Sequence, residues 1–186
     1  DFQFARRREG TLEHLNAVAA ALDYDVEQVP SVIVNGLRVS STAIRDALGS
    51  GDMKTASKLL GRPYRMSGKI VKGDRGGRTL GYPTANVELR RRQSAVMGIF
   101  AVRVHGIDGG PHDAVASVGS RPTFNGTKPI LEVHIFDFDE DIYGKYIHVD
   151  FIAWLRDQVK LDMVEDLVAQ MDVDADNARS ALAADA

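Results

Sequence analysis

The sequence lacks cysteine, and its apolar residues never form a run long enough to cross a membrane. With no cysteine among 186 residues, disulfides and thiolate metal sites are excluded. No apolar stretch approaches the roughly 18 residues needed to span a bilayer, and no segment has the pattern of a signal peptide. We therefore expect a cytoplasmic protein. The chain begins at Asp1 without a methionine, so we take it for a piece of a longer protein.

The chain also has little excess charge and few aromatic residues. The formal net charge is −3, and aromatic residues make up 7% of the sequence. A barrel that binds single-stranded nucleic acid needs a basic groove with exposed aromatic side chains, and a membrane-surface binder needs a basic face. We expect neither nucleic acid nor membrane as a partner. The hydrophobic content of 44% fits a globular protein, and composition does not indicate an oligomeric state.

The spacing of apolar residues changes near residue 62. Before it, helical spacing at 11–22, a short apolar run at 31–34 and two further helices ending at 49 and 60 form an α/β pattern. After it, apolar and polar residues alternate in six stretches, which predicts short antiparallel strands closed into a barrel or sandwich. These stretches are 66–72, 84–89, 99–105, 114–118, 130–136 and 147–155.

Helices are predicted again at the C-terminal end. Asp162 and Glu165 have the spacing of a near capping box, and the apolar residues between 163 and 171 recur at helical spacing. This stripe predicts a helix that packs against the core, followed by a second short helix from Asp172. We place the domain junction in a linker helix, so that the chain divides into 1–50, 51–62 and 63–186.

A glycine-rich basic loop leads into the pair Thr84 and Asn86. Residues 72–86 read KGDRGGRTLGYPTAN, and glycine lets backbone N–H groups approach an anion closely. No Gly-Lys-Ser/Thr follows the glycines, so this is not a Walker A loop. Thr84 and Asn86 are two residues apart and share a face of any strand, where they could hold Mg²⁺ and its phosphates. The alternative is that this stretch is a basic, glycine-rich hairpin that binds no ligand.

Two other stretches carry polar groups with alternative interpretations. Hydroxyl residues at 40–42 precede Arg45 at the start of a predicted helix; they form either a helix cap or an anion site at a helix N-terminus. In the strand 130–136, Glu132 and His134 share one face and three aliphatic residues share the other. Glu132 is either part of an exposed barrel face or a general base.

Several motifs together resemble one family. Their order and spacing resemble the kinase module of the bacterial bifunctional riboflavin kinases/FMN adenylyltransferases, over about residues 62–175. The motifs are GYPTAN at 81–86, GSRPTF at 119–124, LEVH at 131–134, DIYG at 141–144 and WLR at 154–156. The resemblance implies a mainly β fold, a six-stranded antiparallel Greek-key barrel with C-terminal helices. It is preceded by an α/β fragment, since 39–45 and 1–4 resemble the end of the adenylyltransferase module.

The resemblance also implies an activity. The chain would phosphorylate riboflavin with MgATP to give FMN and ADP, and the full-length parent would also adenylylate FMN to FAD. Nothing in the chain matches the His-x-Gly-His motif of the adenylyltransferase, so this chain alone should not make FAD. The alternative is a flavin- or nucleotide-binding module without catalysis, which would not need the carboxylate of Glu132.

The resemblance assigns roles to individual residues. Glu132 is the implied catalytic base, and His134 is left as structural. The implied ATP contacts are Gly68, Gly73, Thr84 and Asn86, with Mg²⁺ on Thr84 and Asn86. The implied flavin contacts are Arg121, Tyr143 and Arg156, and the remnant adenylyltransferase phosphate site is Ser41, Thr42 and Arg45.

Overall fold

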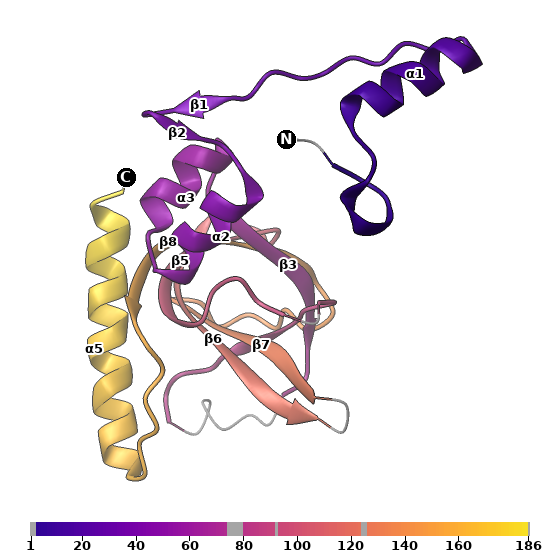
Figure 1. Cartoon of the computed structure of the whole chain (residues 1–186). Coiled ribbons are helices and arrows are strands. Elements are labelled where there is room, and N and C mark those ends of the chain that lie inside the picture. The colour runs from indigo at the N-terminus through magenta and orange to yellow at the C-terminus, as the bar shows by residue number, and fades with distance from the viewer. Residues whose placement is uncertain (1–2, 74–79, 92, 124–125, 186) are drawn as a thin grey trace. The chain divides into compact units, whose positions relative to one another are not determined.

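The computed structural model (Figure 1) describes residues 3–73, 80–91, 93–123 and 126–185. By their contacts these residues form two compact units, Asp1–Ile33 and Val34–Ala186. The first unit holds a short 3-10 turn, η1 (Arg6–Arg8), and the helix α1 (Leu12–Leu22). The Thr11 side chain accepts the His14 backbone N–H at 3.3 Å and caps this helix, which confirms the helix predicted there.

A short hairpin and two helices precede the barrel. The strands β1 (Ile33–Val34) and β2 (Leu37–Arg38) pair around a turn in which both central residues have positive φ. The helix α2 (Ser41–Gly49) follows, then α3 (Met53–Leu60). Ser40 caps α2 by accepting the Ala43 N–H at 3.1 Å, and Asp52 caps α3 by accepting the Thr55 N–H at 2.9 Å.

Helix α3 packs on the barrel through its apolar face. Met53, Ala56 and Leu59 are buried, and α3 contacts β3 and β8. Gly61, in the left-handed region at φ 70°, ends the helix. Helices α2 and α3 thus belong to the same compact unit as the barrel. The boundaries 1–50, 51–62 and 63–186 inferred from the sequence concern the origin of each segment and stay a prediction.

Within the described part of the chain, six strands close into a barrel, as predicted. Every neighbouring pair is antiparallel, and the order around the barrel is β3-β4-β7-β6-β5-β8. Because β4 pairs with β7 and not with β5, the connection has the Greek-key form. The strands are β3 (Tyr64–Val71), β4 (Ala85–Glu88), β5 (Gly98–His105), β6 (His112–Thr123), β7 (Gly126–Ile135) and β8 (Tyr146–Arg156).

The barrel interior is filled by the inward-facing residues of these strands. Phe100 and Phe151 are almost fully buried, and their rings meet edge to face with centroids 5.1 Å apart. Alternation continues across β7, where Leu131 and Val133 are buried and Glu132 between them is only half-buried. The period-two pattern therefore places Glu132 on the outer face of the wall.

The C-terminal segment differs from its prediction. One continuous helix, α5 (Val164–Ala183), replaces the two expected helices, and its N-cap residue Met163 makes no side-chain capping bond. The apolar stripe at its start is exposed, since Met163, Val164 and Leu167 are 61%, 56% and 38% accessible. The predicted capping box and the core-facing stripe are therefore both wrong.

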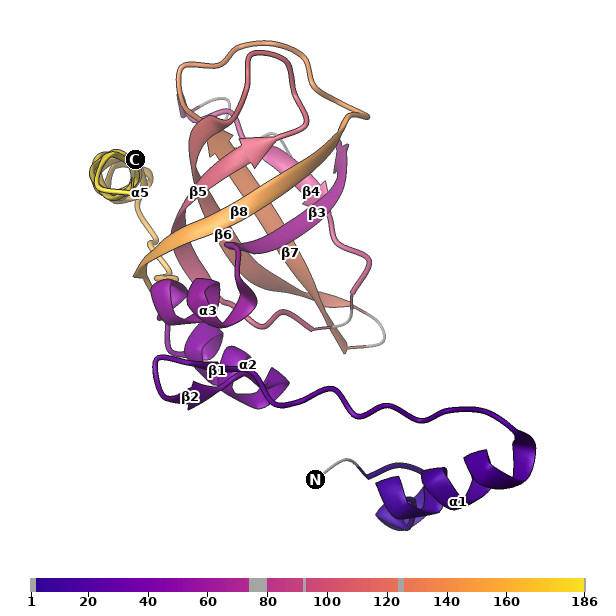
Figure 2. The same cartoon turned by 90° about the horizontal axis from the view of Figure 1, so that it is seen from above.

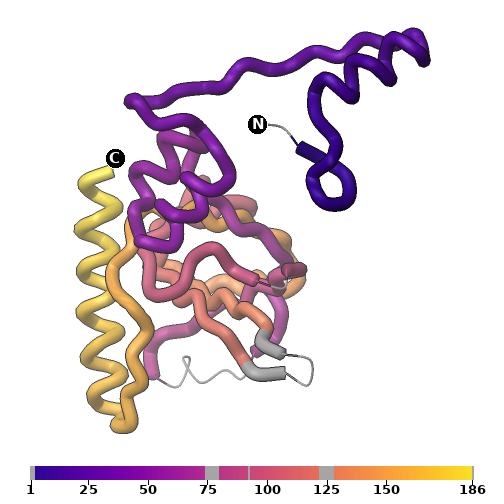
Figure 3. Tube along the Cα trace, viewed as in Figure 1, coloured from indigo at the N-terminus to yellow at the C-terminus, as the bar shows by residue number. Residues whose placement is uncertain are grey.

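The second half of α5 makes the contact with the barrel instead. Ala175, Ala178 and Leu182 are buried against the outer wall, in one cluster with Ala101 and Phe136. Alanines allow a helix to approach a sheet closely, whereas the larger residues of the first half stand away from it. Figure 2 shows α5 end-on, outside the wall, and in Figure 3 it returns beside β8. Among the helices described, none combines the length and the apolar character that a membrane span requires.

Candidate active site

The pair Thr84 and Asn86 lies at the start of β4, the short strand between β3 and β7. Asn86 is paired with Val71 on one side and with Glu132 on the other. Val87 faces the core at 4% exposure, so Thr84 and Asn86 share the opposite face, as their spacing predicts. Gly73 lies directly against Asn86, since a Cβ on Gly73 would come within 2.6 Å of the Asn86 Cγ. The absence of a side chain at Gly73 therefore makes room for the Asn86 amide.

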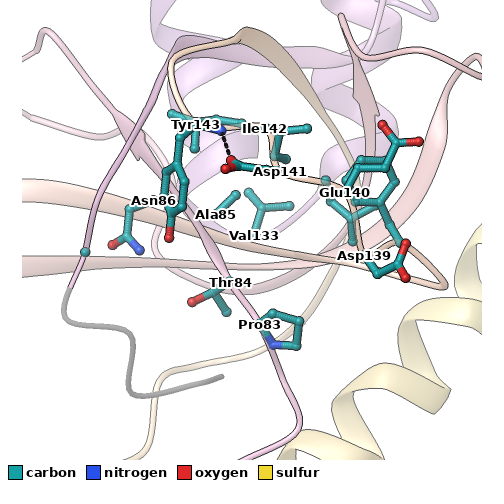
Figure 4. A pocket seen from close by; sticks show the side chains of 14 residues that line it. Pro83, Thr84, Ala85, Asn86, Val133, Asp139, Glu140, Asp141, Ile142 and Tyr143 are labelled. Carbon is teal, nitrogen blue, oxygen red and sulfur yellow. Dashed lines mark hydrogen bonds between the residues drawn. The ribbon is translucent and has the colours of Figure 1, made fainter. Parts of the chain in front are cut away.

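The first of two cavities around this pair lies where β3 and β7 end, and we call it the barrel-end cavity. Its volume is about 480 Å³. Figure 4 shows Thr84, Asn86 and Tyr143 on one side of it and Asp139 and Glu140 on the other. The lining residues are Ile70, Gly73, Pro83, Thr84, Ala85, Asn86, Val133, Ile135, Phe138, Asp139, Glu140, Asp141, Ile142 and Tyr143. The Tyr143 backbone N–H donates to Asp141 Oδ1 at 2.9 Å, which fixes the turn at this side of the cavity.

The second cavity lies on the outer face of the wall, under α5 and the segment 156–160, and we call it the wall cavity. Its volume is about 750 Å³. Its lining mixes polar and apolar side chains, and both kinds come from the strands as well as from α5 and the segment 156–160. The polar lining residues are Tyr82, Thr84, Asn86, Ser117, Glu132, His134, Arg156, Gln158, Lys160 and Asp174, and the apolar ones are Leu80, Ile99, Val115, Ala116, Val159, Leu167 and Met171.

Thr84 and Asn86 line both cavities. The pair therefore forms a part of the wall that the two cavities have in common. Glu132 lines the wall cavity and not the barrel-end cavity. This arrangement suits the transfer of a group from a molecule in the barrel-end cavity to a molecule in the wall cavity, with a carboxylate on the acceptor side.

Arg156 reaches the wall cavity in partnership with a buried carboxylate. Its Nε and Nη2 donate to the two oxygens of Asp174 at 2.7 and 2.6 Å, and Asp174 is only 5% exposed. Gln170 donates to the same carboxylate at 3.1 Å. A bidentate pair of this kind fixes the guanidinium in position, so Arg156 joins the end of β8 to α5.

The two residues before Thr84, Tyr82 and Pro83, are held by hydrogen bonds to α5 and β7. The Tyr82 hydroxyl donates to Asp172 of α5, and the His134 Nδ1 lies 2.9 Å from the Pro83 carbonyl. A carbonyl oxygen only accepts, so His134 Nδ1 carries the proton. Burial, together with the hydrogen bond to Asp172, raises the pKa of Tyr82 to about 12. These contacts set the path of the chain into Thr84.

The structure brings together some of the residues implied by the resemblance and separates others. Glu132, Thr84, Asn86 and Gly73 converge, and Arg156 joins them through the wall cavity. Tyr143 lies in the barrel-end cavity, apart from Arg156.

Two further residues implied by the resemblance, Gly68 and Arg121, are not among the residues that line either cavity. Gly68 lies inside β3 opposite Ile147, where a Cβ would come within 2.8 Å of Val87 and overlap the Glu88 carbonyl. Its backbone thus approaches β4 closely, which leaves no room for a side chain at this position, but Gly68 does not line either cavity. Arg121 is exposed on β6 opposite Lys128.

The hydroxyl residues of α2 also lie apart from the cavities. Ser41, Thr42 and Arg45 are exposed on the first turns of that helix, where the capping oxygen comes from Ser40. Arg75, Arg78 and Phe124, which belong to the predicted loop and motif, lie outside the described residues.

Sequence reasoning missed Ser117, Gln158 and Asp174 in the wall cavity. Asp174 is an acidic residue in the middle of a helix, and Gln158 follows the last strand by two residues. Neither has a local pattern that marks it as part of a site. The one available signal was the proximity of Gln158 to the WLR motif.

A family model and several known proteins match most of the chain. The model of the riboflavin kinase family matches residues 60–182. The chain is 39% identical over 180 residues to a bifunctional riboflavin kinase/FMN adenylyltransferase of Haemophilus influenzae, covering 97% of the chain and 58% of the relative. It is 40% identical to the protein of that name from Escherichia coli, covering 96% of the chain and 57% of the relative.

A solved structure is similar over the same extent. It is a crystal structure described as a macrolide-efflux protein from Streptococcus pneumoniae, with a TM-score of 0.76 and 39% identity, and the match covers 96% of this chain and 58% of that one. The chain thus spans a little under three fifths of the length of these relatives, 58% of the first. With a family model matched over most of its length and a closed six-stranded barrel in the described residues, the chain belongs to the riboflavin kinase family.

Proposed function

We propose that this chain transfers the γ-phosphoryl group of ATP to the 5′-hydroxyl of riboflavin, giving FMN and ADP. The observation that carries the proposal is the shared lining of the two cavities at Thr84 and Asn86. Phosphoryl transfer depends on holding donor and acceptor in line, with little other chemistry for the protein to perform. Two cavities that share one polar pair in their lining support such an arrangement of donor and acceptor.

The position of Glu132 supports the assignment of each substrate to a cavity. A general base must reach the proton of the attacking hydroxyl, so it belongs on the acceptor side. Of the two cavities, Glu132 lines only the wall cavity, and this supports the assignment of riboflavin to the wall cavity and of ATP to the barrel-end cavity. The wall cavity also offers apolar side chains for a flat ring, at Val159, Leu167 and Met171, and polar side chains for the ribityl chain.

The proposed step is a direct transfer. The riboflavin 5′-oxygen forms a bond to the γ-phosphorus as the bond from that phosphorus to the bridging β-γ oxygen breaks, and ADP leaves with the bonding electrons. Glu132 accepts the proton released from the hydroxyl. Its carboxylate is half-buried and forms no ion pair with any described residue, so it is available as an acceptor.

The Thr84 hydroxyl and the Asn86 amide oxygen fit a magnesium ion that comes with the nucleotide. The described residues contain no cluster of three carboxylate or imidazole ligands, and Mg²⁺ at kinase sites is typically held by one or two protein oxygens together with phosphates and water. Thr84 and Asn86 each offer one hard oxygen ligand of the kind that Mg²⁺ prefers. When bound there, Mg²⁺ would neutralise charge on the transferring phosphate.

The assignment divides the implied flavin contacts. Arg156, held by Asp174, stays beside the proposed riboflavin site. Tyr143 lines the proposed nucleotide site instead, where its ring can pack against the substrate. In this proposal Gly73 lies beside the nucleotide, next to Asn86. Gly68 has a structural role instead, because it allows β3 to pack closely on β4.

We further propose that the longer protein adenylylates FMN to FAD, as the names of its relatives state for them. The present chain covers 58% of the first of those relatives. Residues 41–45 would then be a remnant of the phosphate site of the second activity. This chain by itself is expected to make FMN and no FAD.

A product assay tests the proposal. The chain is incubated with riboflavin, ATP and Mg²⁺, and the flavins are separated by chromatography. FMN without FAD is the expected result. FAD as a product would contradict the assignment of adenylylation to the missing part of the protein, and riboflavin bound without any product would favour a binding module without catalysis.

A further inference from the structure

The wall cavity contains a hydrogen-bonded pair, Ser117 and Gln158, that none of the steps above uses. Ser117 lies on β6 directly opposite Glu132 on β7. Gln158 lies in the segment after β8, and its Nε2 donates to the Ser117 Oγ at 2.8 Å. Both side chains line the wall cavity together with Glu132.

The strand β6 is shaped to receive the glutamine. Gly119 is two residues beyond Ser117 and so lies on the same face of the strand. A Cβ at Gly119 would stand 2.8 Å from Gln158 Nε2 and 2.9 Å from its Oε1. The Gln158 amide therefore lies over the glycine, and this position is determined by two separate features of β6.

The hydrogen bond leaves complementary groups for a ligand. A serine hydroxyl has one proton to donate and two lone pairs. Ser117 accepts the amide proton of Gln158, so its own proton remains available in the cavity. The Gln158 Oε1 remains available as an acceptor. The pair thus offers one donor and one acceptor next to the carboxylate of Glu132.

A polyol matches this combination, because each of its hydroxyl groups both donates and accepts. Side chains directly opposite on antiparallel strands have Cβ atoms about 4.5–5.5 Å apart, so a hydroxyl chain running past Glu132 also runs past Ser117. The apolar residues Val159 and Leu167 also line the cavity. They suit the ring part of a flavin rather than its sugar alcohol.

We infer that Ser117 and Gln158 form a specificity-determining pair that binds the ribityl chain of the flavin beside Glu132. This inference rests on the proposed function. In it, Ser117 donates to a ribityl hydroxyl, Gln158 accepts from a neighbouring one, and the pair aligns the 5′-hydroxyl with the carboxylate. These two residues, and not the contacts with the ring, would distinguish flavins that carry a ribityl chain from flavins that lack it.

The test compares two flavins that share the ring. Binding of riboflavin and of lumiflavin, which has a methyl group in place of the ribityl chain, is measured by fluorescence titration for each variant. Ser117→Ala and Gln158→Ala should each weaken riboflavin binding by about tenfold, as expected for one lost hydrogen bond. Lumiflavin affinity should change less than about twofold by the same reasoning. The double variant should lose little more than either single one, because the two residues act as a unit.

Controls separate this role from a structural one. Ser117→Thr keeps the hydroxyl and should retain the preference for riboflavin. Ser180→Ala removes an exposed hydroxyl that donates only to the Asp176 carbonyl within α5, and should change neither affinity. Gln158 is exposed, so its replacement tests the inference even where Ser117→Ala lowers stability.

The outcomes also separate the inference from the proposed function. Equal losses for both flavins, or no loss for either, would overturn the role of the pair while the unaltered chain still makes FMN. An unaltered chain that neither binds riboflavin nor makes FMN would overturn the proposed function, and the inference with it.

Discussion

Asn86 on β4 and Glu132 on β7 are directly paired residues on the outer face of the barrel wall. The next strand, β6, places Ser117 opposite Glu132 in the same row. One row across three strands thus contains an amide, a carboxylate and a hydroxyl. Sheet register alone sets their spacing, so the proposed chemistry depends on the pairing of β4 with β7 as much as on any side chain.

Replacing Glu132 by glutamine tests the proposed base. The amide keeps the shape of the side chain but has no useful affinity for a proton. We expect riboflavin and ATP to bind with unchanged affinity and kcat to fall by about 10²–10⁴, the usual contribution of a general base. Stopped-time FMN assays and binding titrations on the same preparation give both numbers. Normal turnover by this variant would show that the base lies elsewhere.

The contact between Gly73 and Asn86 leads to a second prediction. An alanine at Gly73 would place its Cβ within 2.6 Å of the Asn86 Cγ, a separation at which one group must move. We expect Gly73→Ala to displace the Asn86 amide and to weaken nucleotide binding by about tenfold, comparable to the loss of one hydrogen bond to a charged group. Nucleotide titration in the presence of Mg²⁺ measures the change.

Two other glycines provide matched comparisons. Gly49→Ala adds a methyl group where nothing lies within 4 Å, inside α2, and should leave nucleotide affinity unchanged. Gly68→Ala meets Val87 and the Glu88 carbonyl, so it should lower thermal stability, with nucleotide binding affected only as far as the barrel unfolds. An affinity loss confined to Gly68→Ala would instead support the sequence-based assignment of Gly68 to the ATP site.

The barrel could be predicted from the sequence because its signal is repeated in every strand. Alternation in segments such as 99–105 fixes which residues face inward, and a register slip of one residue would expose that whole set. The site residues Thr84 and Asn86 share a face for the same reason. Their convergence with Glu132 requires the pairing of β4 with β7. Local pattern does not contain this pairing, and the family resemblance implied the residues' shared role but not which strands pair.

The helix α5 shows what local pattern cannot decide. Residues 163–171 have the stronger apolar stripe, yet the buried face comes from Ala175 and Ala178. The choice depends on the partner surface, where Ala101 on β5 leaves space for a close approach, and that surface is remote in sequence. Two residues of the predicted stripe, the exposed Leu167 and the half-buried Met171, line the wall cavity instead.

The ion pair between Arg156 and Asp174 yields a third prediction. Asp174→Asn keeps the size of the side chain but removes its charge and replaces one acceptor oxygen by an NH2 donor, so the pair loses one of its two bonds to Arg156 and the charge that strengthens the other. We expect the free energy of unfolding to fall by about 1.5–3 kcal/mol and riboflavin affinity to fall as Arg156 becomes mobile. Denaturant unfolding and riboflavin titration measure the two effects.

An exposed ion pair serves as the control for that variant. Asp108 is 94% exposed where it meets Lys145 at 3.3 Å, and exposed pairs contribute about 0–1 kcal/mol. Asp108→Asn should therefore leave the free energy of unfolding nearly unchanged. Similar losses in both variants would mean that the burial of Asp174 has no special effect.

The raised pKa of Tyr82 gives a prediction about alkaline pH. The pKa rises from 10.0 to about 12, first through burial and then through the hydrogen bond to Asp172. Between these two pH values the unfolded chain has lost the phenolic proton and the folded chain retains it. The contribution of this group to stability is therefore fully present below pH 10 and is lost as the pH approaches about 12.

Tyr82→Phe isolates this contribution, because all other groups titrate alike in both proteins. The difference in the free energy of unfolding between the two should be constant below pH 9, about one unit under the unfolded pKa, and should change steadily above pH 10. The sign is that the unaltered chain loses stability relative to the variant as the pH rises. A difference that stays flat up to pH 11 would mean that Tyr82 ionises alike in both states and that the bond to Asp172 does not restrain the chain before Thr84.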